Sequence, residues 1–219
     1  MTETEQTTGE VESLVACLLE MAELETNPVL QVISPKIPLQ ENKKYPSDLL
    51  QFSELGWRAY YHCHPASRAG NHRFKGEHGH FHIFVRIEDE ENDTIRWSHL
   101  VALSMDNMGQ PLGWFTVNQW VTGDTWLDSD TLSTYLKSIP YNNSSITTLV
   151  ERWLLSMIAV SRDDVSSVLR ARDKSLNQKQ LSFKDLNIKQ DKELYLLSEI
   201  PINLIKLLGK FTNKSELDQ

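Results

Sequence analysis

The sequence predicts an α+β protein in which a small antiparallel sheet of about four strands packs against N-terminal and C-terminal helices. Three observations predict this class: apolar residues at helical spacing near the N-terminus, four aromatic and β-branched segments in the middle of the chain, and helical patterns in its last third. We expect a single domain over residues 8–211, with a histidine-bearing sheet at 57–121, a helical part at 128–211 and a disordered tail at 212–219.

The composition excludes several classes of protein. The 219 residues include 30 acidic and 22 basic side chains, a net charge of −8, which argues against a nucleic-acid partner. No apolar run approaches the roughly 20 residues of a membrane span, and the polar N-terminus does not resemble a secretory signal. Two cysteines cannot form a disulfide framework. We therefore expect a cytoplasmic protein that binds no membrane.

The first helix is expected over residues 8–25. Its apolar residues fall on one face of a helix. They are Val11, Leu14, Val15, Leu18, Leu19 and Ala22. Four prolines between residues 26 and 50 predict an extended, irregular connection, with a short helix at 47–56 before the sheet.

Four strands are expected next, separated by polar and glycine-containing links. They are Trp57–His64, His78–Ile87, Ile95–Met105 and Leu112–Val121. Because short links join antiparallel neighbours, the simplest arrangement is a meander.

Helical patterns follow the fourth strand. Asp128 is placed to cap a helix that Pro140 ends. A long helix is expected from about 145 to 172, and a further helical stretch at 190–209, where Pro201 starts a new helix or bends the old one.

Histidine is the most informative residue type, since all seven histidines lie between His62 and His99. Side chains alternate faces along a strand, so His62 and His64 share a face, and so do the histidines at 78, 80 and 82. The simplest antiparallel register places His64 opposite His78, His62 opposite His80, and His82 opposite Tyr60.

This register predicts a metal site. Facing side chains lie about 5 Å apart, so one divalent ion can contact imidazoles from both strands. The expected ligands are His62, His64, His78 and His80. Imidazole suits Zn, Fe, Mn and Cu, so the identity of the metal stays open. A hydrogen-bonded histidine and tyrosine network without metal is the alternative.

Two residues beside these ligands are candidates for catalysis. His82 lies at the edge of the site, and Glu77 can ligate the ion, orient a histidine or act as a general base. For His99 a role in a loop or in the core is the expectation.

Four further residues are candidates for binding a substrate. Arg68 and Arg73, in the link between the histidine segments, can hold a carboxylate or phosphate; simple charge balance is the alternative. Asn118 and Trp120 share a strand face and can wall a pocket; core packing is the alternative.

Two resemblances are carried by these motifs. Residues 78–84, His-Gly-His-Phe-His-Ile-Phe, resemble the histidine-triad signature of nucleotide hydrolases and transferases, which implies that His80 is a nucleophile. Gly79 departs from the signature, and the match covers only seven residues.

The broader resemblance is to an uncharacterised group of bacterial proteins. Tyr-Tyr-His-x-His-Pro at 60–65 and Glu-His-Gly-His-Phe-His-x-Phe at 77–84 carry it. It continues through 99–101 and 118–123 and covers roughly residues 57–135. No activity is attached to that group.

The leading hypothesis is that the chain is a metal-binding protein that acts as a metal-dependent hydrolase or oxygenase on an anionic small molecule. Metal-free nucleotidyl or phosphoryl transfer through His80 is the second, and a non-catalytic metal carrier or partner-binding module the third. Metal content separates the first from the second.

Overall fold

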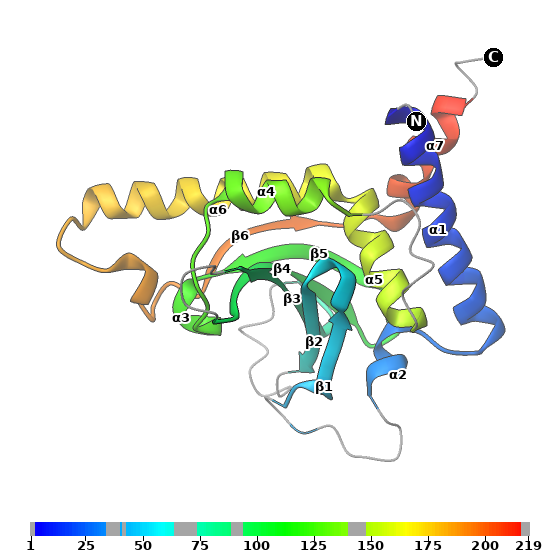
Figure 1. Ribbon diagram of the computed structural model, residues 1–219, viewed down its shortest axis with the longest axis horizontal. Helices are drawn as coiled ribbons and strands as arrows, with labels where there is room; N and C mark the ends of the chain where they lie inside the picture. The colour runs from blue at the N-terminus through cyan, green and yellow to red at the C-terminus, as the bar shows by residue number, and fades with distance from the viewer. Residues whose placement is uncertain are drawn as a thin grey trace.

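The structure, a computed structural model, describes residues 3–33, 40, 43–63, 74–88, 94–139 and 148–215. Within these ranges six strands form one antiparallel sheet, each strand beside the next one along the chain (Figure 1). They are β1 (Tyr45–Phe52), β2 (Trp57–Cys63), β3 (Glu77–Ile87), β4 (Arg96–Asp106), β5 (Pro111–Val117) and β6 (Leu196–Pro201).

The α+β class and the antiparallel meander are confirmed, but the expected number of four strands is wrong. The two additional strands, β1 and β6, are the edges of the sheet. Each contains a proline, Pro46 in β1 and Pro201 in β6. In the sequence alone, a proline indicates the end of a regular helix or strand. Edge strands tolerate proline because one side of the strand has no ladder to complete.

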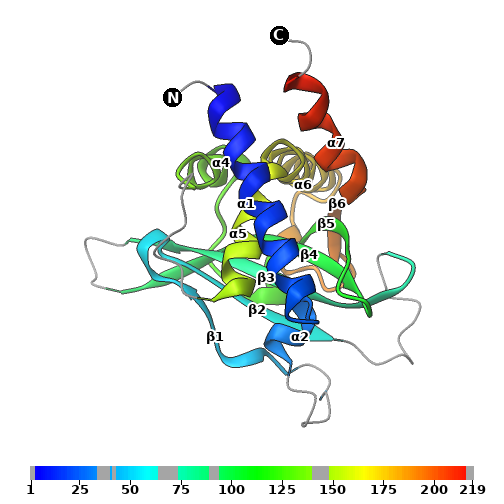
Figure 2. The same cartoon turned by 90° about the vertical axis from the view of Figure 1, so that its right-hand side faces the viewer.

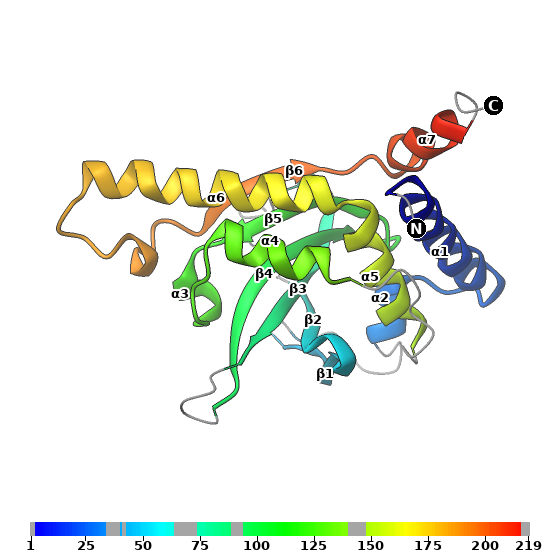
Figure 3. The same ribbon diagram turned by 45° about the horizontal axis from the view of Figure 1, so that its top comes forward.

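The helices lie mainly on one side of the sheet (Figures 1 and 3). They are α1 (Glu3–Glu23), α2 (Pro28–Val32), α3 (Gln119–Thr122), α4 (Ser129–Lys137), α5 (Leu149–Val160), α6 (Arg162–Ser182) and α7 (Leu204–Ser215). Two short 3₁₀ turns, η1 (Ser53–Leu55) and η3 (Ile188–Gln190), complete the described elements.

The long helix expected at 145–172 is two helices. Ser161, with φ −103° and ψ 16°, ends α5 and precedes α6. The two have different surroundings: α5 is buried over nearly its whole length, whereas α6 is buried along one side only. The helical stretch expected at 190–209 is divided into β6 and the first half of α7.

The main core lies between the sheet and the helices. Trp57 and Tyr61 from β2 and Phe81 from β3 join Leu14 of α1 and Trp153 of α5 in one buried apolar cluster. Burying side chains of this size supplies most of the free energy that stabilises the fold. The side chains on the opposite face of β2–β5 are therefore not part of this main core.

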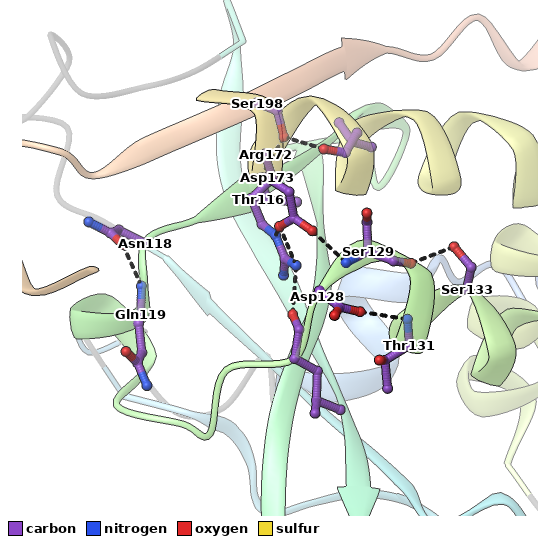
Figure 4. A network of polar contacts seen from close by, with 12 residues as sticks. Thr116, Asn118, Gln119, Asp128, Ser129, Thr131, Ser133, Arg172, Asp173 and Ser198 are labelled. Atoms are coloured by element: carbon purple, nitrogen blue, oxygen red, sulfur yellow. Dashed lines mark hydrogen bonds and ion pairs between the residues drawn. The ribbon is translucent and has the colours of Figure 1, made fainter. Parts of the chain in front are cut away.

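The predicted cap at Asp128 is present. Its carboxylate accepts a hydrogen bond of 2.8 Å from the backbone N–H of Thr131 in the first turn of α4 (Figure 4). Beside it, the Ser129 N–H donates to Asp173, which also pairs with the buried Arg172 of α6. These contacts join α4 to α6.

Among the residues that the structure describes, none of the helices combines the length and apolar character needed to cross a bilayer.

Candidate metal centre

Antiparallel pairing of β2 and β3 positions the histidines. His62 lies opposite His80, and Tyr60 opposite His82, as the sequence predicts. Apolar residues of both strands face the helices, for example Tyr61 and Phe81. The alternate residues consequently face the other side of the sheet, which we call the histidine face.

Three imidazoles meet on the histidine face. The Nε2 atoms of His62 and His80 are 2.7 Å apart, and one ring nitrogen from each of His62, His80 and His82 lies within 4.8 Å of the other two. Their ring centroids are 4.4–5.1 Å apart. His80 and His82 are buried, whereas His62 is partly exposed. This is the only such group of three among the described residues.

A carboxylate orients the central ring. Glu77 Oε1 contacts His80 Nδ1 at 2.9 Å, and Ser104 donates to Glu77 Oε2 at 2.8 Å. Side chains alternate between the two faces of a regular strand, so Glu77, three residues before His80, would point to the opposite face of the sheet. A register irregularity between Glu77 and Gly79 in the pairing of β3 with β4 brings it to the histidine face.

His99 enters the site through a second irregularity. Its Nε2 lies 2.9 Å from Nδ1 of His82, and the pairing shifts between Ile83 and Phe84, where β4 passes from Val101 to His99. His99 is thus in contact with the cluster, although the sequence indicates only a loop or core role. Ser104 has no sequence signal marking it as part of a site, and His99 is marked only by the resemblance that continues through residues 99–101.

His78 is not brought to the cluster. Its Nδ1 contacts the Tyr61 hydroxyl at 2.7 Å, and its ring stacks on the Tyr61 ring with an interplanar angle of 17°. The irregularity that redirects Glu77 therefore also separates His78 from His80. Burial lowers the pKa of the His78 imidazole, with Asp106 opposing this effect.

Aromatic rings surround the three histidines. Tyr60 and Phe115 lie against His82, with centroid distances of 5.4 and 6.2 Å, and Phe115 also meets His80 edge-on at 5.1 Å. Phe84 completes this wall. Burial raises the pKa of Tyr60 to about 12, so its phenol is neutral at pH 7. The cluster therefore lies in largely apolar surroundings.

A narrow pocket lies beside His99, and Asp124 and Arg172 are among its lining residues. Burial raises the pKa of the Asp124 carboxyl, while Thr122 and Arg58 act in the opposite direction. Arg58 itself stacks over Trp97, with its guanidinium carbon 4.1 Å from the ring centroid. The pocket thus has one acidic and one basic side chain, Asp124 and Arg172, in its lining together with His99.

The other predicted site residues have different positions. His64, Arg68 and Arg73 lie outside the described residues. Asn118 is buried and accepts a hydrogen bond from the Gln119 N–H at the start of α3 (Figure 4). Its side-chain amide donates to the Ile188 carbonyl. The Trp120 indole donates to the Leu194 carbonyl. These two side chains anchor the segment between α6 and β6, and their polar atoms are engaged there.

Comparison with known proteins relates the chain to one family. A family model described as a domain of unknown function (DUF6969) matches residues 8–202. No curated protein and no solved structure matches the chain.

Proposed function

We propose that this chain, which belongs to the DUF6969 family, is a metal-binding protein whose ion is held by His62, His80 and His82. The convergence of three imidazole nitrogens, two of them 2.7 Å apart, carries the proposal. It fits a divalent transition metal, with Zn, Fe, Mn and Cu all compatible with imidazole.

The spacing of the nitrogens supports coordination. Two nitrogens bound at about 2.1 Å to a tetrahedral ion lie about 3.4 Å apart. His62 and His80 approach within 2.7 Å, so binding requires their rings to separate by less than about 1 Å. Rotations of the two side chains about χ1 and χ2 can supply such a shift.

Glu77 prepares His80 for this role. A carboxylate only accepts hydrogen bonds, so His80 carries its proton on Nδ1 and directs the Nε2 lone pair at His62. A metal ligand needs that tautomer, and histidines that bind metals commonly donate their second N–H to a carboxylate. His82 contacts His99 through Nδ1, so Nε2 is the atom it would offer.

Burial favours coordination over nucleophilic catalysis by His80. A histidine that attacks a phosphate must reach a bulky substrate, but His80 is 0% exposed and both of its nitrogens have neighbours. An ion is small enough to enter between the rings. The apolar wall would then strengthen the attraction between the ion and the Glu77 carboxylate behind His80.

Three protein ligands leave a tetrahedral ion one position for water or substrate, as in catalytic zinc sites. This arrangement supports a hydrolase or an oxygenase, and an anionic small molecule would approach the ion from the side of His62, the one partly exposed ring of the three. A metal carrier uses the same ligands and differs in lacking turnover. Buried free cysteines, Cys17 and Cys63, suit a reducing cytoplasm as its location.

Metal analysis of untagged protein tests the proposal. After chelation and separate reloading with Zn²⁺, Fe²⁺, Mn²⁺ or Cu²⁺, followed by desalting, we expect at least one of these ions to remain at one per chain by mass spectrometry. Retention of none of the four would contradict the proposal.

Ser104→Ala tests the role of the orienting carboxylate. The substitution removes the hydrogen bond to Glu77 Oε2, so His80 is held less firmly. We expect metal affinity to fall about 10-fold, measured by competition with a chromophoric chelator. Ser98→Ala, at another buried serine of β4, is the matched control and should leave affinity unchanged.

A further inference from the structure

Two exposed surfaces of opposite charge lie at opposite ends of the molecule. One is the outward face of α1, and the other is the end of α6 with the turn that follows it. Figures 1 and 3 place these two surfaces at the two ends of the long axis of the molecule. Figure 2 views the molecule from the end at which α1 lies, so α1 is in front.

The outer face of α1 is apolar in its centre. Residues on it recur at helical spacing and are all exposed. They are Glu12, Val15, Ala16, Leu19, Ala22 and Glu23. Leu19 is 61% exposed, because the buried side of α1 is formed instead by Leu14, Cys17 and Met21. The helix has no lysine or arginine, and Glu12 and Glu23 give this face an acidic group at each end. Glu10 and Glu20 pair with Arg162 and Arg152.

The α6 tip, residues 177–187, has the complementary character. Every one of these residues is exposed, including three large apolar side chains: Leu181 (74%), Phe183 (53%) and Leu186 (55%). The tip contains two lysines, Lys179 and Lys184, and one aspartate, Asp185, a net charge of +1 in a chain whose net charge is −8.

The tip is held in a fixed conformation. The Gln180 side-chain amide donates to the carbonyls of Phe183, Lys184 and Leu186, at 3.0, 3.3 and 3.0 Å. The exposed apolar groups therefore sit on a formed turn, which lowers the entropy lost when a partner covers them.

We propose that the α6 tip of one copy docks on the outer face of α1 of another copy. Each surface offers apolar side chains, and their charges are opposite, so the two surfaces fit each other better than either fits itself. A contact of this head-to-tail kind leaves one tip and one α1 face free in every dimer. Association consequently continues into longer chains or a ring.

The two surfaces that meet in this contact are small, so we expect the association between copies to be weak. We expect the weight-average mass to rise above the monomer value of 25.2 kDa as concentration increases, over the range from about 10 µM to about 1 mM that suits so small a contact. High salt should reduce it, since lysines and glutamates flank the apolar contact. Sedimentation equilibrium at low and high salt measures both effects.

Complementation between variants gives the decisive test. Leu181→Gln with Phe183→Gln removes the tip surface, and Val15→Gln with Leu19→Gln removes the α1 surface while keeping residues that suit a helix. Each double variant alone should stay monomeric. Mixing the two should restore a dimer and nothing larger, since one intact tip and one intact α1 face remain. Met108→Gln changes a residue 68% exposed outside both surfaces and should associate like the wild type.

Circular dichroism of each variant separates a lost contact from a lost fold. A wild-type chain that stays monomeric throughout the concentration range overturns the proposal. So does association that either double variant leaves intact, or a pair of double variants that fails to complement.

Discussion

Replacing His80 by Ala should reduce retained metal from one ion per chain to less than about a tenth of that value, because loss of a direct ligand costs more than the 10–100-fold typical of an orienting partner. His80 is the central ring: it contacts His62 through Nε2 and Glu77 through Nδ1. Mass spectrometry of the reloaded, desalted protein gives the result directly.

Loss of fold must be distinguished from loss of a ligand. His80→Ala leaves a cavity and the buried Glu77 carboxylate with one contact fewer, so the variant is also destabilised. His62→Ala removes a partly exposed ligand at a smaller structural cost and should lose metal to a similar extent.

His78→Ala is the matched control, since His78 lies in the same strand but stacks on Tyr61. It should retain the ion. The reverse pattern, with metal lost in His78→Ala and kept in the other two variants, would place the centre elsewhere.

Much of this arrangement could be predicted from sequence, because it follows from strand alternation and a simple hairpin register. His62 opposite His80 requires only that the first two expected strands pair antiparallel in the simplest register. The predicted helix at Asp128 depends on local capping chemistry. Both are short-range properties that a single sequence contains.

The positions of Glu77, His78 and His99 relative to the cluster could not be predicted, because two irregularities in strand pairing decide them. A shift between Glu77 and Gly79 brings Glu77 toward His80 and turns His78 toward Tyr61, and another brings His99 to His82. Each changes which face a side chain occupies without changing residue types. Regular alternation therefore places His78 with the ligands and leaves His99 out.

The edge strand β6 could not be predicted for a different reason. β6 follows α6 by a long connection and pairs with β5, about 80 residues earlier in the chain, for example through Thr116 and Ser198. Local pattern cannot reveal such a partner. The apolar residues of 196–200 suit a helix or a strand equally, and tertiary pairing decides between them.

Gly79→Ala should have the largest effect on stability, lowering the free energy of unfolding by about 3 kcal/mol. A methyl group at this position would lie 2.5 Å from the His62 carbonyl oxygen and 2.5 Å from the Tyr61 hydroxyl oxygen. The first of these is backbone of the neighbouring strand, so β2 must move away from β3. Because His62 and His80 belong to those strands, metal affinity should fall as well. Urea denaturation and chelator competition measure the two effects.

Two further variants separate the backbone clash from other causes. Tyr61→Phe in the Gly79→Ala background removes the contact with the hydroxyl but leaves the His62 carbonyl and the ring carbon Cζ of residue 61, which lies 2.6 Å from the added methyl, so it should restore only part of the stability. Gly209→Ala, in α7 with nothing within 4 Å of the added methyl, should instead raise stability by about 0.5–1 kcal/mol. If Gly79→Ala proves as stable as the wild type, β2 and β3 do not approach each other as closely as the three-histidine site requires.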